Sequence, residues 1–198
     1  MGFLKKFTKQ EISWMMYDWA NSAHSVIVVT ILPIFFDSVA SCTADSVSSM
    51  STWGYATSIA MAIVALAAPF LGVFGDIRGM RKKLFTAFLL LGVVSVAGLA
   101  FTPLMDFASS TAVASKVAML VLVLYILSTI GFDASCIYYD AFLTDVTTED
   151  RMDSVSTLGY GLGYIGGSTI PLLIFLIMNA VGVPMLTSLA IIFAITAV

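Results

Sequence analysis

Six long apolar runs constrain the fold of this chain more than any other feature of its sequence. They occupy about 13–37, 53–74, 84–105, 116–140, 155–180 and 185–198. Most approach the ~20 residues that a helix needs to cross a bilayer. Hydrophobic residues make up 60% of the chain and charged residues only 11%, whereas soluble domains carry about 25% charged residues. The sequence therefore predicts an all-α polytopic membrane protein, with a cytoplasmic N-terminal segment at 1–12 and a six-helix transmembrane unit at 13–198.

The basic residues fall on alternate connections between these runs. Eight of the nine lie before the first run, after the second or after the fourth: Lys5, Lys6, Lys9, Arg78, Arg81, Lys82, Lys83 and Arg151. Only Lys116 falls on the other side. Lys and Arg are concentrated in cytoplasmic loops, so we predict a multi-pass protein with a cytoplasmic N-terminus. A bacterial inner membrane and a eukaryotic vacuolar membrane fit equally well. The lipid bilayer is the expected partner of this surface, and no nucleic acid is expected.

The sixth run is shorter than a spanning helix. From Met185 it has 14 residues to Val198, about 21 Å of helix against a hydrocarbon core of ~30 Å. We interpret the last helix as truncated and the chain as a fragment of a longer protein. A natural half-size protein that dimerises is the alternative.

Polar residues interrupt the first run, where they are costly. Asp18, Asn21 and His24 lie within the stretch from Tyr17 to His24, and an ionisable side chain at the bilayer centre costs about 2.5–3.5 kcal/mol on insertion scales. Such residues face other helices or a water-filled cavity, so they indicate a solute pathway. Thr8 and Glu11 have capping-box spacing and predict the start of this helix.

Other motifs have simpler interpretations. The sequence Gly161–Gly166 matches GxGxxG, but a dinucleotide site needs a preceding strand. Gly159, Gly163 and Gly167 recur every four residues and predict a helix face that packs closely on a neighbour. Lys5–Lys9 followed by an apolar run and Cys42 resembles a lipoprotein signal, but the run is too long for one.

Cys42 and Cys136 have no metal-ligand spacing, and we expect no disulfide between them, no metal and no cofactor. Two Tyr-Asp pairs, Tyr17-Asp18 and Tyr139-Asp140, allow an intramembrane aspartyl protease as an alternative, because two carboxylates can share a proton. Asp133 lies in a Gly-Phe-Asp sequence, without the GxGD context of that protease family. We therefore expect no enzyme.

The connection between the second and third runs has an ordered set of turn and charge residues. Gly72, Asp76, Gly79 and Arg81 stand in that order, with Lys82 and Lys83 following. The glycines permit close packing and a tight reversal, and Asp76 can pair with a cation. A cytoplasmic loop selected for topology alone is the alternative.

This connection resembles the signature loop of the major facilitator superfamily, G-x-x-x-D-R-x-G-R-R/K. Gly72, Asp76, Gly79 and Arg81 match in register, whereas Ile77 and Met80 depart from it. Three further segments resemble the vacuole-effluxer-like family of that superfamily, which includes the autophagy-related amino-acid effluxer. They are Tyr17–Ala23, Asp140–Leu143 and Ser156–Gly167.

The resemblance implies a twelve-helix transporter made of two six-helix halves around a central cavity. The chain would be the amino-terminal half, and its partner would be the missing carboxy-terminal six-helix half. Between parallel halves the substrate site lies near the bilayer midplane. The implied activity is secondary transport that exports small solutes such as amino acids. A non-transporting membrane scaffold is the alternative.

Depth along the helices narrows the candidate residues. With the first helix centred near Ser25 and the fourth near Ser128, Asp18 and Asp133 fall at similar levels, and Asp140 lies near the cytoplasmic mouth. We expect Asp18 or Asp133 to be a protonatable coupling group.

The remaining candidates are two hydrogen-bonding side chains and a charge pair. We expect Asn21 and His24 to bind the solute through hydrogen bonds, and Asp76 with Arg81 to form a gate contact. A packing role is the alternative for Asp18 and for His24.

Overall fold

The first apolar run forms one long helix with a π-helical turn in its middle. In the computed structural model, which describes residues 6–43 and 46–197, α1 (Lys9–Val26), the π segment η2 (Ile27–Ile31) and α2 (Leu32–Ala40) form a single stretch of 32 residues. The Thr8 hydroxyl accepts a hydrogen bond from the Glu11 amide at 3.2 Å, and the Thr8 amide donates to the Glu11 carboxylate at 2.7 Å. The predicted capping box is confirmed.

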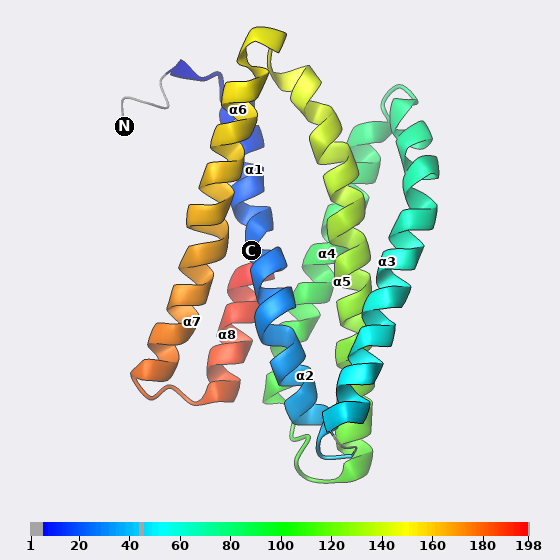
Figure 1. The fold of residues 1–198 in the computed structure, drawn as a ribbon, viewed down its shortest axis with the longest axis vertical. Helices are drawn as coiled ribbons and strands as arrows, with labels where there is room; N and C mark the ends of the chain where they lie inside the picture. The colour runs from blue at the N-terminus through cyan, green and yellow to red at the C-terminus, as the bar shows by residue number, and fades with distance from the viewer. Residues whose placement is uncertain (1–5, 44–45, 198) are drawn as a thin grey trace.

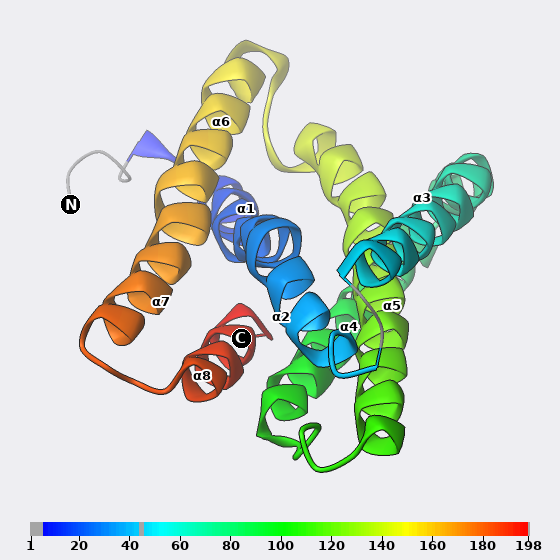
Figure 2. The ribbon, with the colours of Figure 1, turned by 60° about the horizontal axis from the view of Figure 1, so that its bottom comes forward.

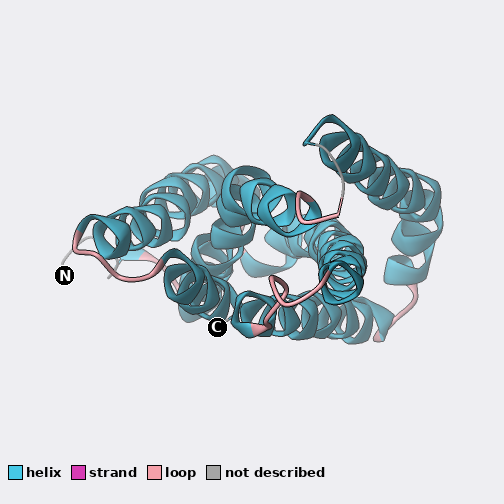
Figure 3. Cartoon of the chain, turned by 90° about the horizontal axis from the view of Figure 1, so that it is seen from below, coloured by secondary structure: helices cyan, strands magenta, loops and turns pink. Residues whose placement is uncertain are grey.

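The rest of the described chain is also helical (Figure 3). Its elements are α3 (Ser46–Asp76), α4 (Met80–Phe101), the short η3 (Thr102–Leu104), α5 (Thr111–Val146), α6 (Glu149–Leu162), η4 (Gly163–Thr169), α7 (Ile170–Ala180) and α8 (Met185–Ala197). The π segment η4 joins α6 and α7 into one stretch of 32 residues. Within the described residues, five helices are long and apolar enough to cross a membrane, and α8 is a shorter apolar helix. The protein is therefore an all-α polytopic membrane protein.

Several helices begin before the apolar runs that predict them. α5 begins at Thr111 after the N-cap Ser110, whose hydroxyl accepts from the Val113 amide at 3.3 Å. α6 begins at Glu149 after Thr148. Hydrophobicity marks the part of a helix that crosses lipid, whereas caps mark where the backbone begins to turn. Of the predicted segments, residues 1–5 and Val198 lie outside the described residues.

The connections gather at two opposite ends of the bundle (Figure 1). The start of α1, the α3–α4 connection and the α5–α6 connection lie at one end, which is the top of Figure 1. The α2–α3, α4–α5 and α7–α8 connections lie at the other end. The basic residues Lys6, Arg78, Arg81 and Arg151 therefore occupy one end of the molecule.

The first span is the central element of the bundle (Figure 2). It lies between α3 and α5 on one side and α6, α7 and α8 on the other. Its residues Ile31, Leu32 and Phe35 pack in the main apolar core with Leu99 of α4 and Ile192 of α8. In an 18-residue apolar stretch of the first span 56% of the residues are buried, whereas in the corresponding stretch of α3 only 11% are buried. α3 therefore presents most of its apolar surface outward.

Candidate functional site

Contacts between α1 and α5 fix how the polar stretch of the first span is presented. The Trp14 indole N–H donates to the Tyr139 carbonyl at 3.0 Å, and the Tyr17 hydroxyl lies 2.9 Å from the Ser135 hydroxyl. One turn further on, the Asn21 amide donates to the Cys136 sulfur at 3.2 Å. The His24 ring stacks on Phe132 with 4.4 Å between ring centroids. Residues 14–24 therefore run antiparallel to residues 139–132.

The larger of two cavities beside this contact is acidic. It has a volume of about 700 Å³ and is lined by residues of α1, η2, α5, α6 and η4. Asp18 and Asn21 of α1 line it together with Asp140 of α5. We refer to it as the acidic cavity. Its volume falls in the range of small-molecule sites, about 300–1,000 Å³.

A second, smaller cavity lies on the other side of Asn21 and Phe132, which line both cavities. It has a volume of about 240 Å³ and is lined by α1, α4, α5 and α8. His24 lines this smaller cavity and is only 8% exposed. Its Nε2 atom has no hydrogen-bond partner among the described residues. His24 therefore lines a cavity together with Asn21, but it does not line the acidic cavity that holds Asp18 and Asp140.

Asp133 lines neither cavity. The α5 residues that face the acidic cavity are Phe132, Cys136, Tyr139, Asp140 and Leu143. Asp133 precedes Asp140 by seven residues, so the two differ by only about 20° in rotation but by about 10 Å in height along α5. The structure therefore brings Asp18 together with Asp140 in the acidic cavity, and Asp133 does not line it.

The glycine series of α6 and η4 lies against α1. A Cβ atom at Gly159 would lie 2.9 Å from the Trp14 ring, and one at Gly163 would lie 2.6 Å from the Ser22 hydroxyl. A Cβ atom at Gly167 would overlap the Trp19 carbonyl and lie 2.8 Å from Ser22 Cβ. Missing side chains at these positions allow the two helices to approach closely. Gly161 and Gly166 of the GxGxxG match lie in α6 and η4, and the residues described before them (6–43 and 46–160) contain no strand.

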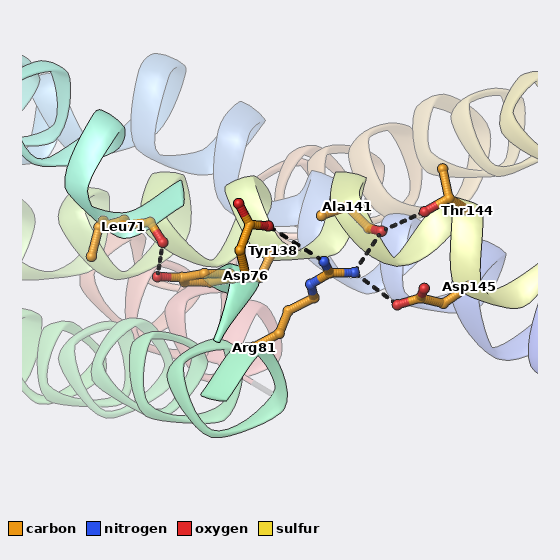
Figure 4. Close-up of polar contacts among 7 residues, drawn as sticks. All are labelled: Leu71, Asp76, Arg81, Tyr138, Ala141, Thr144 and Asp145. Carbon is orange, nitrogen blue, oxygen red and sulfur yellow. Dashed lines mark hydrogen bonds and ion pairs between the residues drawn. The ribbon is translucent and has the colours of Figure 1, made fainter. Parts of the chain in front are cut away.

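Arg81 is the centre of a polar cluster at the α3–α4 connection (Figure 4). Its guanidinium lies 3.8 Å from the Asp76 carboxylate and 2.8 Å from the Asp145 carboxylate, and it donates to the Ala141 carbonyl at 3.3 Å. Asp76 is 83% exposed, so its pairing is the weaker one. The sequence did not single out Asp145, because the contact joins residues 64 positions apart.

The glycines at the end of α3 and in the α3–α4 connection differ in their surroundings. Gly79 has φ of 80°, a left-handed conformation that favours glycine, and it precedes α4. A Cβ atom at Gly72 would meet nothing within 4 Å in the described chain, whereas one at Gly75 would lie 2.8 Å from the Tyr138 ring. Gly75, and not Gly72, is therefore the close-packing position here.

A buried carboxylate also joins the start of α1 to the α5–α6 connection. Glu11 is 1% exposed, accepts from the Thr147 hydroxyl at 2.7 Å and pairs with Arg151 at 3.0 Å. Arg151 donates to the Lys6 carbonyl at 2.8 Å and lies over the Phe7 ring. Sequence reasoning gave Glu11 only its capping role.

This arrangement of long apolar helices around two cavities is that of a polytopic membrane protein. The profile of the family described as "Vacuole effluxer Atg22 like" matches residues 43–198, and the chain belongs to that family. It is also 45% identical over 173 residues to a Bacillus subtilis (strain 168) protein named "Uncharacterized MFS-type transporter YxiO".

The match covers 86% of this chain and 38% of the relative, so the chain spans well under half of that protein's length. No solved structure matches. The resemblance to a major-facilitator-type vacuole effluxer is confirmed.

Proposed function

We propose that this chain is the amino-terminal half of a secondary transporter that exports small solutes, amino acids among them, by alternating access. The observation that carries the proposal is the acidic cavity of about 700 Å³, which places Asp18, Asn21 and Asp140 within the apolar spans. Polar groups at this depth are expensive unless they serve a pathway. The name of the family supports efflux.

The partner in this proposal is a carboxy-terminal six-helix half. Parallel halves of major-facilitator transporters enclose the substrate between them near the midplane. Two observations support a larger assembly: α3 presents an apolar surface outward, and the match covers only 38% of the length of the Bacillus subtilis relative. The N-terminus is cytoplasmic in this proposal, because seven described basic residues, all but Lys116, lie at or near the α1-start end. The host membrane is a bacterial inner membrane or a vacuolar membrane.

Proton coupling is assigned to a carboxyl group of the spans. Asp18 is half-buried in the acidic cavity, and Asp133 is half-buried on α5. Asn21 and His24 supply hydrogen bonds to the solute, and the orphaned Nε2 of His24 supports such a contact. A carboxyl group that changes protonation with access would couple solute movement to a pH gradient.

The test uses the full-length parent protein in proteoliposomes loaded with a mixed amino-acid pool, with and without a pH gradient. We expect gradient-dependent efflux that Asp18→Asn lowers at least tenfold. Asp153→Asn, which removes an exposed carboxylate of α6 outside both cavities, is the matched control. Efflux that survives Asp18→Asn leaves Asp18 a packing role, and absence of efflux for every amino acid overturns the substrate class.

The Asp76–Arg81 pair is proposed as a gate contact that breaks and re-forms between states. Arg81→Gln should slow efflux at least tenfold while the protein remains folded. Arg78→Gln is the control, because Arg78 is exposed and has no ion pair among the described residues. Equal effects of the two substitutions would rule out a specific gate.

A further inference from the structure

Two carboxylates share the acidic cavity without a compensating cation. Asp18 comes from α1 and Asp140 from α5, and the described residues that line the cavity include no Lys, Arg or His. The ion pairs found within residues 6–43 and 46–197 involve neither carboxylate. Two negative charges in one site attract a cationic occupant and repel an anionic one.

Gly163 leaves space for one of these carboxylates. A Cβ atom at this position would lie 3.0 Å from Asp18 Oδ2. That distance is tight for a carbon–oxygen contact, so a side chain there would displace the carboxylate. The π segment η4 therefore allows Asp18 to stay beside the cavity.

Aromatic side chains form much of the remaining wall. Trp14, Tyr139, Tyr160 and Tyr164 line the cavity. Tyr160 and Tyr164 have ring centroids 4.8 Å apart in an edge-to-face arrangement and hydroxyls 3.2 Å apart. Tyr160 is 64% and Tyr164 58% exposed, so both residues are available to a ligand. Aromatic faces attract cations through the ring quadrupole.

The Tyr139 hydroxyl is a second, independent sign of a ligand. Tyr139 lines the cavity, is 5% exposed, and its hydroxyl has no hydrogen-bond partner among the described residues. An unpaired buried polar group is unfavourable, and this one belongs to a residue of the cavity wall. An ammonium group has three N–H donors, which the two carboxylates can accept.

We propose that the acidic cavity binds a protonated amine, so that the transported solute carries an ammonium group held by Asp18 and Asp140. This inference rests on the proposed transport function and names the chemical group that the site selects. The described residues contain no cluster of three or more His, Cys, Asp or Glu that could hold a metal ion, and the aromatic wall suits an organic cation.

The transport test compares matched solute pools in proteoliposomes of the full-length parent protein. One pool holds amino acids, the second the same amino acids N-acetylated, and the third the corresponding decarboxylated amines. N-acetylation removes the positive charge, so we expect efflux of the second pool to fall at least tenfold, while the first and third pools are exported. Comparable export of the N-acetylated pool would overturn the ammonium site and leave the transport function intact.

A binding test separates the two proposals if no pool is exported. We expect 2-phenylethylamine to raise the thermal unfolding midpoint of the purified full-length protein in detergent, and the neutral 2-phenylethanol to leave it unchanged. The shift should disappear in Asp18→Asn and Asp140→Asn and persist in Asp153→Asn. Unliganded midpoints report whether each variant is folded. Equal shifts with amine and alcohol, or no shift with the amine, would overturn the ammonium site.

Discussion

At Gly167 the π segment η4 touches the backbone of α1. A Cβ atom there would overlap the Trp19 carbonyl, which cannot move without displacing the helix. Gly161 lies on the same continuous helix, and a Cβ atom there would meet nothing within 4 Å of the described chain. The two glycines therefore belong to one continuous helical stretch, Gly161 in its α-helical part and Gly167 in its π segment, and their surroundings are opposite.

This difference predicts opposite effects of the same substitution. Gly167→Ala should lower the free energy of unfolding by about 1–3 kcal/mol through overpacking. Gly161→Ala should be neutral or stabilise the protein by up to about 1 kcal/mol, because alanine is the better helix former. Thermal or denaturant unfolding of the full-length protein in detergent measures both values. A Gly167→Ala variant as stable as the parent would show that the helices can separate there.

The site residues could be predicted from sequence as a set, but not in their grouping. Asp18, Asn21 and Asp140 were identified because they are polar within apolar runs, and all three line the acidic cavity. Depth alone suggested that Asp18 pairs with Asp133. Asp133 and Asp140 share nearly the same rotation on α5 and differ by about 10 Å in height, and the sequence does not show at which height the cavity lies.

At the scale of elements, Glu11 and Arg151 tie α1 to the start of α6. Glu11 is almost fully buried, whereas the Arg151 side chain is 38% exposed. Loss of Arg151 leaves a buried carboxylate without its cation. Loss of the Glu11 charge leaves an arginine that water can still solvate. The two substitutions are therefore not equivalent.

Arg151→Met should cost about 3 kcal/mol or more of unfolding free energy, because an unpaired buried charge is strongly destabilising. Glu11→Gln should cost about 1 kcal/mol, since the amide keeps the hydrogen bonds to Thr8 and Thr147 in part. The double variant should be more stable than Arg151→Met alone. A double-mutant cycle by chemical denaturation measures the coupling, and equal single-variant losses would contradict the asymmetry.

The helical elements could be predicted in type and approximate centre but not in extent. The midpoints of Lys9–Ala40 and Thr111–Val146 fall beside the expected centres Ser25 and Ser128. Helix starts could not be read from hydropathy, because residues such as Glu149 and Asp150 continue the helix beyond the apolar run. The Arg81–Asp145 and Glu11–Arg151 contacts join distant positions, which local patterns do not encode.

At the scale of the whole molecule, the connections lie at two opposite ends (Figure 1). This separation predicts that cysteines placed at the two ends are accessible from opposite sides of the membrane. Cys42 is exposed in the α2–α3 connection, at the end away from the start of α1. Asp150 is exposed near the start of α6, at the other end.

With the other cysteines of the parent replaced by serine, a membrane-impermeant maleimide should label Cys42 in intact cells. A variant carrying Asp150→Cys with Cys42→Ser should be labelled only after the membrane is permeabilised. Labelling is followed by a gel shift. The reverse pattern would place the N-terminus outside the cytoplasm.

The π segment η4 also affects how the chain can vary in length. A π turn holds about one residue more than an α turn, so removing one residue between Gly163 and Thr169 would close it to an α turn and leave α7 close to its present rotation against α6. Gly159 would keep its place against Trp14, but the wide turn that brings Gly166 and Gly167 against Trp19 would be lost. A homologous chain that lacks one residue here should therefore keep the direction of α7 and carry a compensating change at the position of Trp19 in α1.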